Sequence, residues 1–136
     1  MSWSESLIKL ATYEVESRQQ QLAEIARRLA HAEMRLALLQ AEGEAEATRA
    51  TQDAQAGWYH AGYAEGLRIR KAALKAEIDV ILAEERGARD GLAQAFEEQK
   101  KYEQVAESMR LAALKEANRR ENAEFDEVGM RAARRR

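Results

Sequence analysis

Residues 8–43 decide the fold, because they read IKLATYEVESRQQQLAEIARRLAHAEMRLALLQAEG and carry apolar side chains at alternating spacings of three and four. The positions at this spacing are Ile8, Ala11, Val15, Arg18, Leu22, Ile25, Leu29, Ala32, Leu36, Leu39 and Gly43. Such a spacing forms one apolar stripe along a helix and is typical of a coiled coil. The stripe has one polar interruption. We therefore predict a long helix that packs against a second one.

A second stripe follows later in the chain. Its positions are Leu74, Ile78, Ile81, Glu85, Ala88, Leu92, Ala95, Gln99, Tyr102, Ala106, Met109 and Ala113. Between the stripes, residues 56–66 hold three glycines and three aromatic residues. Glycine destabilises a helix by about 1 kcal/mol relative to alanine, so the turn is expected at 56–59. This predicts one all-α domain over 1–136, with helices at about 4–55 and 60–130. Trp58, Tyr59 and Tyr63 then either pack around the turn or anchor a partner.

The two stripes meet if the chain folds into an antiparallel coiled-coil hairpin. Pairing residues whose numbers add up to 117 places Ile8 opposite Met109 and Arg18 opposite Gln99. The second helix is longer, so it overhangs from about residue 112. The alternative is one uninterrupted helix in a parallel dimer, but the glycines would then weaken the middle of the rod. The hairpin is favoured, and we expect it to be a monomer.

Composition narrows the possible functions. The 136 residues are 34% charged, include no cysteine and no proline, and carry a formal net charge of −2. A disulfide scaffold and a zinc-thiolate site are therefore excluded. A net charge this close to zero gives no reason to expect nucleic acid as the main partner. No apolar run reaches the roughly 18 residues that span a bilayer, and the start lacks the pattern of a signal peptide, so a cytoplasmic protein is expected.

No set of residues points to catalysis. Gly57 and Gly62 have the spacing of a phosphate-binding loop, but Tyr63 and Ala64 replace the lysine and hydroxyl residue that it needs. His31 has arginines one turn away on either side, which disfavours a metal there. The carboxylates alternate with Lys and Arg on outward positions, and no concave pocket is expected. We predict no enzyme activity, no cofactor and no metal.

Several segments together resemble the FliJ family of the bacterial flagellar type III export apparatus. They are Tyr13-Glu14-Val15-Glu16, the turn containing Gly and aromatic residues, the longer second helix, and Asp126-Glu127-Val128-Gly129-Met130-Arg131-Ala132-Ala133-Arg134 near the end. The run Ala56-Gly57-Trp58-Tyr59-His60 points to an alphaproteobacterial member. The resemblance implies a soluble export component in the cytoplasm, held peripherally at the inner membrane at the flagellar base.

The resemblance also implies partners. Family members are similar to the central stalk of rotary ATPases, enter the hexameric ring of the export ATPase, touch the membrane export gate and bind export chaperones. The gate-contacting positions look like Tyr63 and Leu67, which are expected to lie off the stripe and to bind a partner rather than support the fold. Glu42 and Glu46 replace the tyrosines that accompany them on the first helix. The implied ATPase-contacting residues are Trp3, Leu7, Ile8, Leu114, Phe125, Val128, Met130, Arg131, Arg134, Arg135 and Arg136. The competing hypothesis is a generic structural scaffold or dimerisation module.

Overall fold

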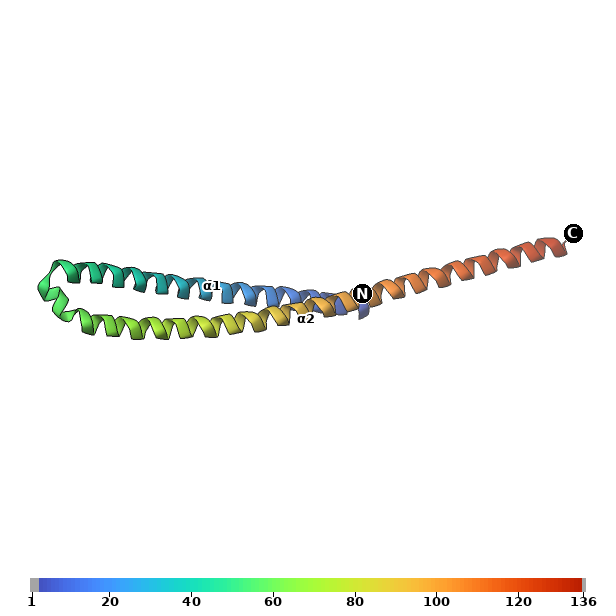
Figure 1. Cartoon of the computed structure of the whole chain (residues 1–136). Helices are drawn as coiled ribbons and strands as arrows, with labels where there is room; N and C mark the ends of the chain where they lie inside the picture. The colour runs from blue at the N-terminus through green and yellow to red at the C-terminus, as the bar shows by residue number, and fades with distance from the viewer. Residues whose placement is uncertain (1–2, 136) are drawn as a thin grey trace. The chain divides into compact units, whose positions relative to one another are not determined.

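The computed structural model describes residues 3–135, apart from the side chain of Ala56. It contains two helices, α1 over Trp3–Gln52 and α2 over Ala54–Arg134 (Figure 1). No strand occurs among the described residues. The all-α class predicted from the two stripes is confirmed.

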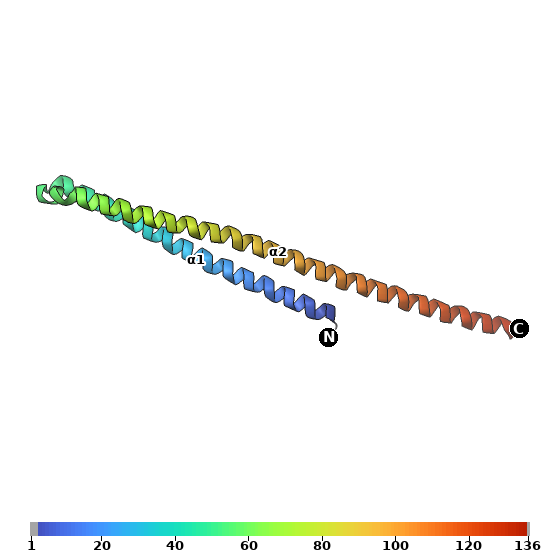
Figure 2. The same ribbon diagram turned by 90° about the horizontal axis from the view of Figure 1, so that it is seen from below.

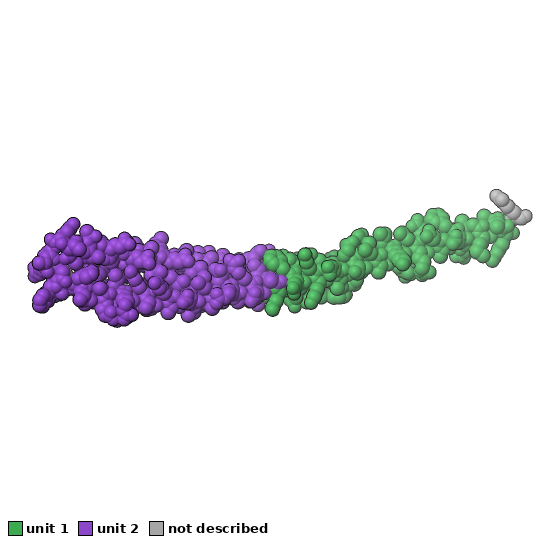
Figure 3. Space-filling model, viewed as in Figure 1, with its two compact units in different colours: residues 1–15, 94–136 green, residues 16–93 purple. Residues whose placement is uncertain are grey.

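The chain divides into two compact units, one of residues 16–93 and the other of residues 1–15 and 94–136 (Figure 3). Within residues 16–93, α1 and α2 run antiparallel side by side (Figures 1 and 2). The buried core of this unit consists of Ile25, Ala32, Leu74, Ile81 and Ala88, with Leu22, Leu29, Leu36, Leu39 and Ile78 packed around it. Every one of these residues lies on a predicted stripe, so the helix faces follow from the heptad spacing.

The register differs from the prediction by one heptad. In residues 16–93, Arg28 Nη1 donates to Glu84 Oε2 at 2.6 Å, and Arg35 Nη1 donates to Glu77 Oε1 at 3.4 Å. Gly43 lies against Leu67. Residue numbers at these contacts add up to between 110 and 112, so the predicted sum of 117 is wrong.

The predicted polar layer of Arg18 and Gln99 is also wrong. In residues 16–93, Arg18 packs over Gly91, where an added Cβ would lie 3.1 Å from Arg18 Nη1. In the other unit, Gln99 Nε2 donates to Thr12 Oγ1 at 3.1 Å. Arg18 and Gln99 therefore each have a neighbour of their own and do not form one polar layer.

Specific contacts explain why the shorter register is adopted. Sums of 110 and 117 both place stripe on stripe, because heptad patterns repeat every seven residues. The shorter one places Leu67 over Gly43, where a side chain on residue 43 would overlap Leu67 Cδ2, and the longer one would place Leu74 there instead. It also brings Arg28 to Glu84, whereas a shift of seven residues would move Glu84 roughly 10 Å along the helix away from Arg28.

The turn lies at Asp53 and not at 56–59. Asp53 Oδ1 accepts a hydrogen bond from the Gln55 amide at 3.0 Å, which is the N-cap arrangement for a helix that begins at Ala54. Gly57 lies inside α2, and an added Cβ there would be 3.2 Å from the Ala50 carbonyl oxygen. Glycine at this position therefore allows the first turn of α2 to approach the last turn of α1.

In the unit of residues 1–15 and 94–136, α2 continues past the start of α1. Ser4 and Ile8 share a groove with Glu103, Ala106 and Arg110, which marks the level where α1 begins. We call residues 111–134 of α2 the overhang. Its large apolar side chains are Leu111, Leu114, Phe125, Val128 and Met130, and each is 50% exposed or more. The predicted overhang is present.

Candidate partner-binding surfaces

Tyr63 connects the two helices in residues 16–93. Its hydroxyl donates to Glu42 Oε1 at 2.8 Å, and the Arg70 guanidinium carbon lies 5.9 Å from the centre of its ring. The hydrogen bond to Glu42, helped by partial burial, raises the pKa of Tyr63, while the charge of Arg70 opposes the rise. Tyr63 is half-buried, so part of its side chain stays accessible to a partner. The Glu42 carboxylate thus helps to hold Tyr63 in place.

Leu67 does not lie off the stripe as expected. It is 8% exposed, and its Cδ2 packs onto Gly43. The cause is the register, because α2 pairs with α1 one heptad further toward the turn than predicted. The sequence carried a signal for this, since Leu67 lies one heptad before Leu74. Leu67 is therefore part of the core, and Tyr63 is the accessible member of the predicted gate-binding pair.

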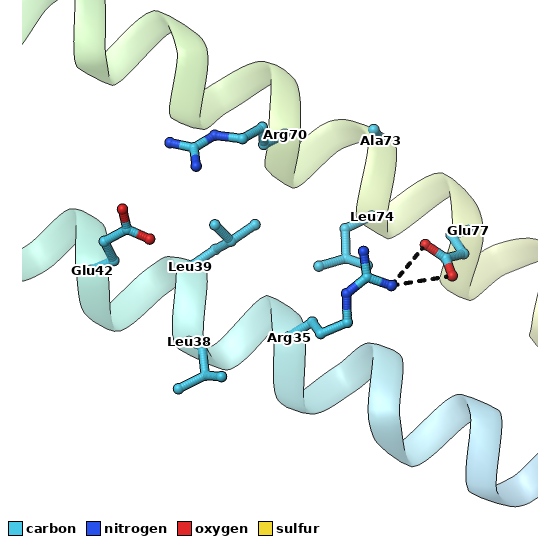
Figure 4. A pocket seen from close by; sticks show the side chains of 8 residues that line it. All are labelled: Arg35, Leu38, Leu39, Glu42, Arg70, Ala73, Leu74 and Glu77. Atoms are coloured by element: carbon cyan, nitrogen blue, oxygen red, sulfur yellow. Dashed lines mark hydrogen bonds and ion pairs between the residues drawn. The ribbon is translucent and has the colours of Figure 1, made fainter.

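An open groove of about 440 Å³ runs between the helices beside Leu74 (Figure 4). Its lining residues are Arg35, Leu38, Leu39, Glu42, Arg70, Ala73, Leu74 and Glu77. Figure 4 shows Arg35 and Glu77 joined at one end, Glu42 and Arg70 toward the other, and leucines between them. The expectation that the chain offers no concave pocket is thus wrong. Leucines between mixed charges suit the side chains of a protein partner.

The tip of the hairpin exposes two aromatic side chains. Trp58 is 82% exposed and Tyr59 is 66% exposed. For Trp58 and Tyr59, packing around the turn is therefore excluded, whereas Tyr63 packs against α1 through its hydrogen bond to Glu42. Nearby, the Nδ1 atom of His60 is buried with no hydrogen-bond partner among the described residues. The tip is a small apolar surface.

The predicted ATPase-contacting residues form two groups in the unit of residues 1–15 and 94–136. Trp3 is 59% exposed, Leu7 and Ile8 are half-buried, and Ile8 shares a groove with residues 103–110 of α2. The second group lies on the overhang, where Phe125, Val128 and Met130 are exposed. At 1.5 Å per residue, roughly 30 Å of helix separates the first group from Phe125, Val128 and Met130, and Leu114, which is 51% exposed, lies between them. The structure therefore does not bring them into one surface.

Of the arginines at the end of α2, Arg131 is already engaged in an ion pair within its own helix. Arg131 Nη2 donates to Glu127 Oε1 at 2.8 Å, within the same helix. Arg134 is the last residue of α2, and Arg135 is exposed. Arg136 lies outside the described residues. Arginine at this end also suits the helix dipole.

No helix within residues 3–135 is long and apolar enough to cross a membrane. In the same residues, no three metal-binding side chains come together. Among the described residues, candidate partner surfaces include Tyr63 with the groove, the tip, the Ser4 and Ile8 groove, and the overhang.

The comparisons with known proteins decide the family. The family described as Flagellar FliJ protein matches residues 5–136. The chain belongs to the FliJ family. It is 49% identical over 131 residues to the Flagellar FliJ proteins of two strains of Caulobacter vibrioides, NA1000 / CB15N and ATCC 19089 / CIP 103742 / CB 15. Each alignment covers 96% of this chain and 94% of the relative. No solved structure matches the chain.

Membership of the FliJ family confirms the resemblance stated from the sequence, including its alphaproteobacterial character. The match extends over both helices and the overhang, and it is not confined to one heptad-rich segment. A generic coiled coil would share heptads with many proteins but not identity at this level over almost the whole length. The flagellar interpretation is therefore favoured over an unrelated scaffold.

Proposed function

We propose that this FliJ-family chain is a non-enzymatic component of the flagellar protein export apparatus. It acts as a central-stalk-like partner of the hexameric export ATPase, couples that ATPase to the membrane export gate, and binds export chaperones. Its association with the membrane is peripheral and runs through the gate. The family match over residues 5–136 supports the export role, and the exposed overhang is the observation that carries the stalk role.

The overhang has the properties of a shaft that enters a ring. Phe125 is 65% exposed and Val128 is 61% exposed, and α1 does not extend along this part of α2. Burial of a large apolar side chain contributes about 1.5 to 3 kcal/mol, so several of them inside a ring would hold the shaft. The terminal arginines add attraction toward acidic loops, which salt should weaken. Trp3, Leu7 and Ile8 would form a second contact further along the shaft.

The stalk role is tested with the purified export ATPase and the full-length chain. Changing Phe125 and Val128 to Asp should abolish stimulation of ATP hydrolysis, because both side chains would otherwise be buried in the ring. A control with Gln104→Glu and Asn122→Asp adds the same charge on exposed polar positions of α2 and should stimulate normally. Full stimulation by the Phe125→Asp, Val128→Asp variant would show that the overhang is not the shaft.

The gate contact is assigned to Tyr63, the accessible member of the predicted pair. Tyr63→Ala should weaken binding to the cytoplasmic part of the export-gate protein, measured by titration calorimetry. Tyr59→Ala is the matched control, because it removes a tyrosine from the exposed tip. If both variants bind the gate as well as the unchanged chain does, the gate surface lies elsewhere.

A further inference from the structure

The apolar stripe of α2 changes face where α1 begins. Continued at heptad spacing past Met109, the face that α1 covers carries Glu116, Arg120 and Glu127. Met130 lies on that face too, whereas the other four large apolar side chains of the overhang lie on the opposite side. At 100° per residue, Leu111, Leu114, Phe125 and Val128 fall within a sector of roughly 100° centred opposite that face. We call these four residues the overhang stripe. An overhang that merely continued the α1-binding face would not show this change.

The overhang stripe is complementary to itself in the antiparallel direction. Leu111 and Val128 have numbers that add up to 239, and so do Leu114 and Phe125. Two copies placed antiparallel around residues 119 and 120 would therefore bring Leu111 onto Val128 of the second copy, and Leu114 onto Phe125. Each layer pairs the two kinds of core position that meet in an antiparallel coiled coil. All four side chains are at least 50% exposed in the single chain, so their burial would be new.

Polar residues agree with the same register. Asn118 and Glu121 occupy the central stripe positions, and their numbers also add up to 239. The amide of Asn118 could then donate to the carboxylate of Glu121 on the second copy. A polar layer at the centre of a coiled coil weakens it but penalises other registers.

The charged flanks are complementary as well. Within one chain, Arg110 Nη2 donates to Glu107 Oε1 at 2.7 Å, and Arg131 Nη2 donates to Glu127 Oε1 at 2.8 Å. In the antiparallel register, Glu107 lies within one residue of Arg131 of the second copy, since their numbers add up to 238. Opposite charges thus face each other at both ends of the overlap, by symmetry.

We propose that the overhang binds the overhang of a second copy of this chain, antiparallel and with Leu114 facing Phe125 of that copy. This differs from the monomer expected from the paired helices alone. The pairing does not depend on the ATPase contact, but it covers Phe125 and Val128. It would therefore shield the same side chains until a partner replaces the second copy. With only four large side chains per copy and a polar centre, the association is weak and reversible.

The surface is tested by measuring mass against concentration with the purified full-length chain. Sedimentation equilibrium should show the mass rising from 15.4 kDa toward twice that value. Val128→Arg should keep the chain monomeric. Met130→Arg is the matched control, because Met130 is 57% exposed in the same segment but lies roughly 200° away around the helix. A chain that stays monomeric throughout, or equal loss of association in both variants, would overturn the proposal.

The orientation is tested with cysteines, since the chain has none of its own. Asn118→Cys and Glu121→Cys variants are oxidised separately and as a mixture. An antiparallel pair brings position 118 of one copy to position 121 of the other, so the disulfide-linked product should form several-fold faster in the mixture. A parallel pair would bring identical positions together. Faster linkage within each single variant would therefore overturn the antiparallel register.

Discussion

The two parts of α2 differ in what covers them, although they belong to one continuous helix. Along residues 67–106, heptad positions such as Leu74, Ile81 and Ala88 are buried against α1. Along the overhang, equally large side chains such as Phe125 are exposed. Ion pairs three or four residues apart, such as Glu116 with Arg119 at 2.8 Å, support the helix there in place of tertiary packing. A helix can therefore continue past the end of its partner helix, with its exposed apolar side chains available to bind another molecule.

The largest expected contrast is between Ile81→Ala and Phe125→Ala. Ile81 is 2% exposed at the centre of the core, so its truncation should lower the free energy of unfolding by about 2 to 5 kcal/mol. Phe125→Ala should change it by less than about 0.5 kcal/mol, because an exposed side chain loses little packing. Urea unfolding followed by circular dichroism, at a concentration where the chain is monomeric, checks both values. Equal losses would mean that the overhang folds into the core.

A smaller contrast is expected at two glycines. An added Cβ meets no atom within 4 Å at Gly87, in the paired part, or at Gly129, in the overhang. Alanine favours a helix over glycine by about 1 kcal/mol, so Gly87→Ala should raise the free energy of unfolding by that amount. Gly129→Ala should increase the helical signal while the unfolding midpoint stays unchanged. Gly43→Ala provides the counter-example, because Leu67 must move, and its gain should be smaller than that of Gly87→Ala.

The smallest expected effect is on how the unfolding midpoint depends on pH under acidic conditions. The hydrogen bond from Arg28, followed by the charge of Arg28, lowers the pKa of Glu84 below its ordinary 4.5, while burial opposes the change. Glu84 therefore contributes stability above pH 4.5, and this contribution is lost as the pH falls through its lowered pKa. Glu84→Gln should make the unfolding midpoint depend less on pH below 4.5.

Glu116→Gln is the control for the acid experiment. Hydrogen bonding from Arg119 also lowers the pKa of Glu116, but this pair lies within the overhang. Its protonation should change the local helix without shifting the cooperative midpoint. If Glu116→Gln alters the acid dependence as much as Glu84→Gln does, the two parts of α2 unfold together.

Local sequence signals accounted for much of the fold and could have accounted for more. The heptad positions predicted both helices and the faces that they bury. In a helix of 3.6 residues per turn, residues spaced three and four apart all lie on the same side. The turn lies at Asp53, not at the glycines predicted for it, because the N-cap of α2 decides where the chain reverses. Asp53, whose carboxylate accepts from the Gln55 amide, was a readable N-cap signal in the sequence. For the partner surfaces, the exposed overhang was predictable, whereas the burial of Leu67 was not recognised.

The sequence by itself determined the helices, their apolar faces, the overhang and the family, since each depends on residue types at fixed local spacing. Only the tertiary structure decided the register, and with it the burial of Leu67 and the separation of Trp3 from Phe125. The physical reason is that a heptad pattern is unchanged by a shift of seven residues, so apolar matching cannot choose between two registers. That choice depends on contacts that exist only once both helices are paired, such as Leu67 on Gly43 and Arg28 on Glu84.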